Sequence, residues 1–350
     1  MAQRAKPRGK PVAQVKLTDV ARKVGVHTST ASRVLNPATR HMVSPDVAAK
    51  ILAAAEDLGY SPNPFALGLR TRRSRTIGIV VPDLTNPVFP PMVRGIENVL
   101  DEAGFTAILA DAHLAAQERQ VLDRMKSRWV DGLILATATR GHKPAIGDGE
   151  QLPVVLINRV ADGAALSVCN DDSLGIRLAI DHMVELGHRS IAHIAGPQDT
   201  STGYARAAGF VKVMKQHGLE PRVVVQCQSY SEEEGRTAMR KVLGEQDRPT
   251  AVVCANDLLA LGCYDVLRER GLKCPDDVSI SGFNDIPFVD RFNPPMTTVH
   301  IPMFEMGKIA AQLILDVIQN PATKAVSRTV TPTLVVRGST GPVRAKRKGT

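Results

Sequence analysis

The sequence has no uninterrupted apolar run of about 18 residues, the length at which a membrane-spanning helix is recognised. Residues 1–14 are basic, but no apolar stretch follows them, so this segment lacks the pattern of a secretory signal. Both absences argue against a membrane-spanning or exported protein. We therefore expect the chain to act in the cytoplasm.

The spacing of the cysteines excludes two further classes. The five cysteines are Cys169, Cys227, Cys254, Cys263 and Cys274. An odd number with no CxxC spacing is untypical of a disulfide framework or a zinc site. We expect free structural thiols and no bound metal.

Enzyme motifs are lacking as well. No GxGxxG or GxxxxGK[ST] phosphate loop occurs, and neither does GxSxG or HExxH. The histidines are scattered, and His188 and His193 fit structural roles beside or within a predicted strand. Asp171 and Asp172 are adjacent, so their side chains diverge and favour a helix cap before Ser173 over a catalytic pair. We expect neither an enzyme nor a bound cofactor.

The charge is distributed unevenly along the chain. Residues 1–75 contain 14 Lys and Arg against 4 Asp and Glu, whereas the remaining 275 residues contain 30 against 31. A compact basic block joined to a near-neutral body indicates a nucleic-acid-binding module attached to a second domain. The alternative is a disordered basic tail, and the helical periodicity of the block argues against it.

Two short helices are predicted within residues 17–35. Leu17, Val20, Ala21 and Val24 share one helical face, and Gly25 permits a tight turn after it. The second helix turns Ala31, Val34 and Leu35 to one side and Thr28, Ser29, Ser32 and Arg33 to the other. This is the pattern of a helix-turn-helix whose second helix suits the DNA major groove.

A third helix and a basic link follow. Ser44 and Pro45 mark the start of the helix and Gly59 its end. Its apolar stripe comprises Val47, Ile51, Leu52, Ala55 and Leu58. Residues 65–70 can form about one and a half helical turns, too few to be stable alone. The four arginines of this link are Arg70, Arg72, Arg73 and Arg75. Beside DNA phosphates their charges would be neutralised.

From residue 76 onward, short apolar segments alternate with amphipathic ones. The predicted strands are 77–81, 106–110, 132–136, 154–158, 190–194, 223–227, 251–255 and 278–282. The predicted helices are 91–103, 116–128, 173–186, 205–217, 232–243, 257–270 and 303–318. This alternation predicts a parallel sheet covered by helices on both faces.

Three stretches of the sequence resemble one known family. VARKVGVHTSTASRVLN, VSPDVAAKILAAAEDLGYSPNPFALGLR and TIGIVVPDLTNPVF are similar to the opening of lactose-repressor-type (LacI/GalR family) bacterial regulators, and the resemblance runs from about residue 15 to about residue 338. It implies an all-α helix-turn-helix domain, a hinge, and an α/β domain like periplasmic binding proteins, with two doubly wound parallel-sheet subdomains.

The resemblance also implies DNA contacts at matching positions. These are Thr28, Ser29, Thr30, Ser32, Arg33, Asn36, Leu69 and Arg70. Leu69 matches a leucine that wedges into the minor groove, and its alternative role is packing against Phe65. His27 departs from the family, which usually has a Ser there. Because His is a poor N-cap, we expect Thr28 to cap instead and to shift the helix start.

The α/β domain is expected to hold a small-molecule effector between its subdomains, at the carboxyl ends of strands. By position, the resemblance implies effector contacts by Phe89, Asn158, Arg159, Tyr204, Arg206, Tyr230, Asn256, Asn284 and Asp285. Asn158 and Asn284 stand where sugar-binding members often carry Asp. The loss of two carboxylates beside Arg159 and Arg206 favours an uncharged or anionic ligand, a sugar or another small polar metabolite.

Two roles are possible for Arg206 on the sequence alone. It matches the arginine of the family's R-x-x-G-F motif, which implies a ligand contact. Internal pairing with Asp285 or Asp199 is the alternative.

The sequence predicts five segments: a basic arm 1–14, a helix-turn-helix domain 15–60, a hinge 61–75, an effector-binding and dimerisation domain 76–338, and a basic tail 339–350. Within the fourth segment, the chain is expected to cross between the two subdomains near residues 160, 290 and 320. No leucine-heptad tail for tetramers is present, so we expect a homodimer. Its two-fold axis would require a palindromic operator.

We expect a sequence-specific DNA-binding transcriptional regulator of the repressor type, controlled by a small molecule. One rival is a metabolic enzyme with a basic nucleic-acid-binding arm, which turnover of a metabolite would reveal. A second rival, a sugar-uptake binding protein, would need a signal peptide and no helix-turn-helix.

Overall fold

The computed structural model describes residues 15–36, 39–60, 73–112, 115–141, 152–161, 166–221, 223–246, 248–322 and 326–343. The chain divides between Ser74 and Arg75 into two compact units, one residue before the predicted end of the hinge. We call the described parts the helical unit and the large unit. Among these residues, no helix is both long and apolar enough to cross a membrane.

The helical unit contains three α-helices and one 3₁₀ turn. These are α1 (Leu17–Val24), α2 (Thr28–Leu35), η1 (Arg40–Met42) and α3 (Pro45–Asp57). Gly25 ends α1 with φ of 72°, a left-handed conformation that glycine adopts without strain. Val20, Val34 and Ile51 are fully buried where the three helices meet. Burying one such side chain contributes about 1.5–3 kcal/mol, so this small core holds the predicted helix-turn-helix together.

One predicted core position of α3 is wrong. Leu52 is 36% exposed, whereas Ala48 and Ala54 are buried instead. The inward face of α3 is therefore rotated toward Ala48, Ile51 and Ala55, a stripe at i, i+3 and i+7. The small alanines let α3 approach α1 and α2 closely, and this packing detail was not visible in the apolar pattern.

The large unit holds two six-stranded sheets with the orders β11-β5-β4-β3-β1-β2 and β12-β10-β9-β8-β6-β7. The first sheet comprises β1 (Thr76–Val81), β2 (Thr106–Asp111), β3 (Gly132–Leu135), β4 (Val154–Ile157), β5 (Ser167–Asn170) and β11 (Arg328–Val330). The second comprises β6 (Ile191–Ala195), β7 (Val224–Gln226), β8 (Ala251–Cys254), β9 (Ser279–Asn284), β10 (Thr297–His300) and β12 (Thr333–Val335). All pairings are parallel except that of β12 with β10.

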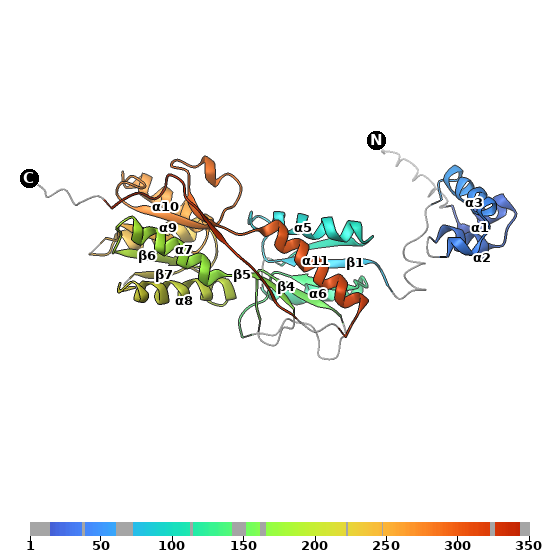
Figure 1. Ribbon diagram of the computed structural model, residues 1–350, viewed down its shortest axis with the longest axis horizontal. Coiled ribbons are helices and arrows are strands. Elements are labelled where there is room, and N and C mark those ends of the chain that lie inside the picture. Colours follow the sequence, from blue (N-terminus) through green and yellow to red (C-terminus); the bar gives the residue numbers. More distant parts are fainter. Residues whose placement is uncertain are drawn as a thin grey trace, which may run out of the picture. The chain divides into compact units, whose positions relative to one another are not determined.

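Helices cover these sheets and define two lobes (Figure 1). Lobe 1 is the first sheet with α5 (Phe89–Glu102), α6 (Ala115–Ser127) and α11 (Met303–Gln319). Lobe 2 is the second sheet with α7 (Asp172–Glu185), α8 (Ser201–Gln216), α9 (Glu232–Leu243) and α10 (Asp257–Glu269). Within lobe 1, α5 and α11 touch backbone to backbone: a Cβ on Gly95 would lie 2.1 Å from the Phe304 carbonyl oxygen.

The chain passes between the lobes three times. The crossings lie at residues 170–172, 300–303 and 330–333, each about ten residues beyond the predicted positions near 160, 290 and 320. The predicted positions fall short because β5, β10, β11 and β12 were not predicted. Their sequences SVCN, TTVH, RTV and TLV are short and rich in polar residues, so tertiary pairing rather than local apolar pattern makes them strands.

The predicted basic tail from 339 begins too early. Ser339 is fully buried, and its hydroxyl donates to the Ile280 carbonyl at 2.6 Å. The Gly341 amide donates to the Ser279 hydroxyl at 3.2 Å, and the Val343 amide donates to the Leu186 carbonyl. Lobe 2 therefore extends at least to residue 343, and residues 344–350 lie outside the described part of the chain.

The two singled-out histidines have structural roles, as predicted. His188 is buried, with its Nδ1 2.9 Å from the Thr250 hydroxyl and its Nε2 3.0 Å from the Gly341 carbonyl. His193 lies within β6, and burial lowers its pKa to about 4. The five cysteines are free thiols.

Candidate functional site

The outer face of α2 carries the predicted DNA-contacting residues of the helical unit. Ala31 and Val34 are buried, which turns the opposite face outward. Ser29 and Arg33 are exposed, whereas Thr28, Thr30, Ser32 and Asn36 are half-buried. Hydroxyl groups and one guanidinium on a short helix can donate to base edges and phosphates. Leu69 and Arg70 lie outside the described residues.

The start of α2 differs from expectation. His27, not Thr28, is the N-cap, because its Nδ1 accepts a hydrogen bond from the Ser29 amide at 3.2 Å. The same nitrogen lies 2.8 Å from the Ser29 hydroxyl. An imidazole nitrogen thus takes the place of a serine oxygen, and Thr28 becomes the first helical residue. The prediction of a shifted helix start was wrong.

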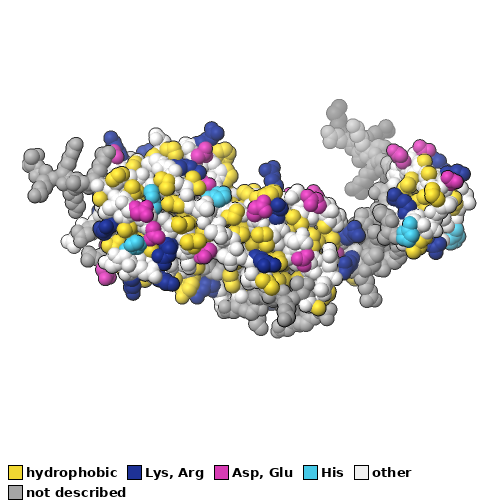
Figure 2. Space-filling view, in the orientation of Figure 1, with side chains coloured by type: hydrophobic (Ala, Val, Ile, Leu, Met, Phe, Trp, Pro, Cys, Tyr) yellow, Lys and Arg dark blue, Asp and Glu magenta, His cyan; other side chains and the backbone are white. Residues whose placement is uncertain are grey.

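On the face of the large unit seen in Figure 2, Lys and Arg side chains are interspersed with Asp and Glu side chains. The candidate site of the large unit is a recess between its two lobes. We call it the central recess. It is lined by Asn86, Val88, Phe89, Asn158, Arg159, Thr202, Arg206, Tyr230, Asn256 and Asn284. The lining comes from loops or helix starts that follow β1, β4, β6, β7, β8 and β9, at the carboxyl ends of parallel strands.

Seven of the nine predicted effector-contacting residues line this recess, and two do not. Tyr204 is 46% exposed, and its ring lies against the guanidinium of Arg140, whose Cζ is 3.4 Å from the ring centroid. The Arg140 amide donates to the Asp199 carbonyl at 2.7 Å. Arg140 follows β3 of lobe 1, and Tyr204 belongs to α8 of lobe 2. The tyrosine therefore joins the two lobes at the rim.

Asp285, the second residue outside the lining, is engaged within lobe 2. Its carboxylate accepts from Arg337 Nη2 at 2.8 Å and lies 3.0 Å from His300 Nδ1. It follows β9 with φ of 58°, one of three left-handed non-glycine residues near the recess. The other two, Asn158 and Asn284, do line it. Non-glycine residues in this conformation concentrate at binding and catalytic sites.

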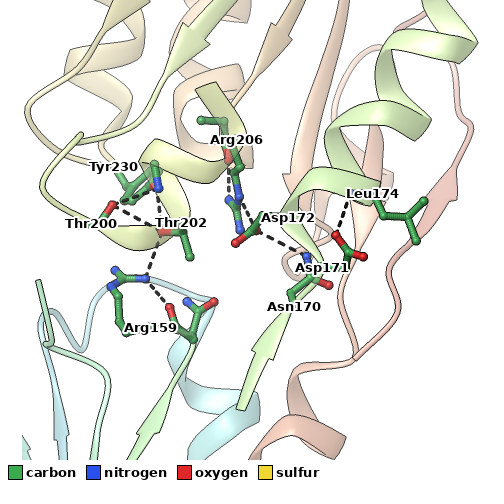
Figure 3. A network of polar contacts seen from close by, with 12 residues as sticks. Arg159, Asn170, Asp171, Asp172, Leu174, Thr200, Thr202, Arg206 and Tyr230 are labelled. Carbon is green, nitrogen blue, oxygen red and sulfur yellow. Dashed lines mark hydrogen bonds and ion pairs between the residues drawn. The ribbon is translucent and has the colours of Figure 1, made fainter. Parts of the chain in front are cut away.

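Arg206 is paired internally, but with neither of the partners considered from the sequence. Its Nε donates to Asp172 Oδ1 at 2.8 Å, and both side chains are almost completely buried (Figure 3). Its Nη1 donates to the Ala255 carbonyl at 2.6 Å, and its guanidinium stacks on Phe283. Asp171 caps α7 through the Leu174 amide as predicted, although α7 begins one residue early, at Asp172.

Arg159 contrasts with Arg206. Only 6% of it is exposed, and its Nη1 donates to the Asn158 carbonyl at 2.7 Å and to the Thr202 hydroxyl at 3.2 Å. Neither acceptor is charged, and no carboxylate among the described residues forms an ion pair with Arg159. Burial, above all, lowers the pKa of its guanidinium.

Further residues shape the recess. Phe89 is buried at the start of α5, and the Tyr230 hydroxyl lies 3.1 Å from that of Thr202. Tyr230 packs so closely on Gly196 that a Cβ there would lie 2.4 Å from its ring. Asn256 caps α10 by accepting from the Leu259 amide, so its carboxamide is held in place.

The lining suits binding rather than acid–base catalysis. Among the described residues it contains carboxamides, hydroxyls, two guanidinium groups and a phenyl ring, but no carboxylate, imidazole or thiol. Such groups can hold a small polar molecule through hydrogen bonds and ring stacking. Asn86, Val88 and Thr202 were not predicted. Asn86 follows β1 within TIGIVVPDLTNPVF, one of the stretches that resemble the family, and Thr202 lies in the first turn of α8.

Comparison with known proteins agrees with this geometry. Residues 16–63 match the model of bacterial regulatory proteins of the lacI family, and residues 180–340 match a periplasmic binding protein-like domain. The chain is 33% identical to the HTH-type transcriptional repressor CytR of Escherichia coli (strain K12) over 330 residues, 93% of this chain and 96% of that protein.

Solved structures show the same arrangement. The lac repressor dimer bound to operator and the anti-inducer ONPF has a TM-score of 0.84 at 28% identity, covering 94% of this chain and 99% of that one. The complex of the transcriptional regulator CelR with cellobiose has a TM-score of 0.72 at 31% identity, covering 93% and 100%. A helix-turn-helix unit, a two-lobed α/β unit and nearly full-length similarity to a repressor together identify the chain as a member of the LacI family of bacterial transcriptional regulators.

Proposed function

We propose that this regulator is a cytoplasmic homodimeric repressor that binds a palindromic operator through α2 and is controlled by a small polar molecule in the central recess. The observation that carries the proposal is that both lobes supply side chains to one recess. Asn158 and Phe89 come from lobe 1, and Arg206 and Tyr230 from lobe 2. A ligand bonded to both lobes changes the free energy of closing one lobe on the other.

The comparisons support both parts of this proposal, binding of an operator by a dimer and binding of a small molecule. The lac repressor neighbour is a dimer bound to its operator, and the CelR neighbour holds cellobiose. A two-fold dimer places two copies of α2 on half-sites related by the same axis, which requires a palindromic site. Contacts by Leu69 in the minor groove remain part of the proposal, with the wedge as the expected role.

The test is selection of DNA from a random-sequence pool with the full-length protein, followed by affinity measurements at one fixed salt concentration. We expect a palindromic site, and we expect Arg33→Ala to weaken binding to it at least tenfold, since a base or phosphate contact is lost. Arg268→Ala, at an exposed position of the large unit, is the matched control and should leave the affinity unchanged. Salt-sensitive binding without a preferred sequence would overturn the proposal.

A further inference from the structure

The two arginines of the central recess differ in how their charge is compensated. Arg206 has a buried carboxylate partner, Asp172, and a carbonyl partner. Within the described part of the chain, Arg159 donates only to the neutral oxygens of Asn158 and Thr202, both from its Nη1 (Figure 3). Of the two buried guanidinium groups in the recess, one is therefore paired with a carboxylate of the described residues and the other is not.

The donors of Arg159 show where a partner would fit. A guanidinium has five N–H groups in a planar fork that matches a carboxylate. The bonds to Asn158 and Thr202 use Nη1, so Nε and Nη2 have no acceptor among the described residues. Asp172, which also contributes a favourable charge interaction, already accepts from Arg206 Nε. Burying an unpaired ion is costly, which makes this position unfavourable until an anion arrives.

A second observation points to a ligand at the same place. Asn158 also lines the recess, and its side-chain Oδ1 is buried without a hydrogen-bond partner. Buried side-chain oxygens are nearly always paired, so this one lacks a donor that the described residues do not supply. A hydroxyl group on the ligand would provide it. The Tyr230 hydroxyl and the Asn284 carboxamide lie in the same lining and can bond further hydroxyls.

We propose that the effector is a small polyhydroxylated monocarboxylate, a sugar acid, whose carboxylate pairs with Nε and Nη2 of Arg159. This inference rests on the proposed function and names the ligand class of the same recess. A monoanion is favoured over a phosphate ester because the recess has one uncompensated guanidinium, whereas a dianion would leave charge unpaired.

The test uses full-length protein and isothermal titration with matched pairs, D-gluconate against D-glucose and D-ribonate against D-ribose, with D-ribose 5-phosphate as the phosphate arm. We expect at least one acid to bind ten times or more tightly than its neutral counterpart, as a charge-assisted hydrogen bond predicts. Arg159→Gln should remove that preference. Arg268→Gln, at the far end of α10 from Asn256, is the matched control and should keep it.

A second measurement does not depend on the choice of compounds. Without ligand, Arg159→Gln should raise the melting temperature by about 2–4 °C, because the variant no longer buries an unpaired charge. A lower melting temperature, equal or tighter binding of the neutral sugars, tighter binding of the phosphate ester, or no binding of either acid would each overturn the proposal.

Measuring operator affinity separates the sugar-acid assignment from the proposed regulation on which it rests. Neutral ligands that change operator affinity would overturn the sugar-acid assignment and leave the proposed regulation standing. An acid that binds through Arg159 but leaves operator affinity unchanged would support the assignment and overturn the regulation.

Discussion

The two lobes of the large unit have equivalent strand orders, but their polar side chains at the ends of equivalent strands have different partners. β4 of lobe 1 and β9 of lobe 2 occupy equivalent places, and at the carboxyl end of each an asparagine with positive φ precedes a charged residue. At β4 these are Asn158 and Arg159, and at β9 they are Asn284, the last residue of the strand, and Asp285. Arg159 lines the central recess, whereas Asp285 turns to Arg337 and His300.

The polar side chains that lobe 2 contributes to the recess are held by other protein groups, whereas those of lobe 1 are not fully hydrogen-bonded. On lobe 2, Arg206 is held by Asp172, and Asn256 by the helix that it caps. On lobe 1, the Oδ1 of Asn158 and the Nε and Nη2 of Arg159 have no hydrogen-bond partner among the residues that the structure describes. Groups already fixed by the protein lose little entropy when a ligand binds, and unpaired groups gain most from it. Ligand binding should therefore affect lobe 1 more than lobe 2.

The largest effect on stability should come from breaking the buried ion pair of lobe 2, Arg206 with Asp172. Arg206→Gln leaves the Asp172 carboxylate buried without a cation, so we expect the free energy of unfolding in urea to fall by about 3–5 kcal/mol. The double variant Arg206→Gln with Asp172→Asn should recover much of this loss, since no charge is then left unpaired. An unchanged stability of the single variant would contradict the comparison, as would a double variant no better than the single one.

The second largest effect is on the pH dependence of stability, through the buried residue Asp257 of lobe 2. Asp257 is fully buried, accepts from the Ile286 amide, and has a pKa raised to about 7, chiefly by burial. Between about pH 4 and 7 the folded state keeps a proton that the unfolded state has released. This residue therefore lowers the stability as pH rises through that window, by up to about 1.4 kcal/mol per unit.

Asp257→Asn should remove that slope, because the amide resembles the protonated acid. The stability of the variant relative to the wild type should therefore improve from pH 5 to pH 8. Taking this difference cancels the opposite contribution of His193, whose lowered pKa adds stability as pH rises from about 4 to 6.5. A difference that is constant with pH would refute the assignment.

A smaller effect is expected at the equivalent asparagines. Asn158→Gly removes a buried, unpaired oxygen, whereas Asn284→Gly removes no such atom, and both substitutions suit a positive φ. We expect Asn158→Gly to be more stable than Asn284→Gly by about 1 kcal/mol in thermal unfolding without ligand. The reverse order would show that lobe 1 is as well satisfied as lobe 2.

The smallest effect should come from the contact at the rim that joins the lobes. Tyr204→Ala removes a cation–π contact to Arg140 worth about 0.5–1 kcal/mol. We expect hydrogen exchange of the Arg140 amide, which donates to Asp199 of lobe 2, to quicken about two- to fivefold. Tyr204→Phe keeps the ring and should keep the protection, so equal exchange in both variants would argue against this contact.

Much of the fold could be predicted from local patterns. Each amphipathic segment from 91 to 318 became a helix, since a stripe of apolar residues at helical spacing survives in any packing that buries it. The segments SVCN and TTVH could not be predicted as strands, because each has only four residues, at least half of them polar, and pairing with β4 and β9 rather than a local apolar pattern makes them strands. Seven residues of the central recess came instead from the family resemblance, which implied effector contacts at their positions.

The sequence by itself determined the basic helical unit, the alternation of strands and helices, and the loops that form the recess, because these depend on composition and on contacts between near neighbours. Only the tertiary structure decided which charges are compensated. It paired Arg206 with Asp172 and turned Asp285 away from the recess and Tyr204 to its rim. It gave Arg159 no carboxylate partner among the described residues. Ion pairing depends on distances of a few ångströms between segments that are remote in the chain, and these exist only once the lobes have formed.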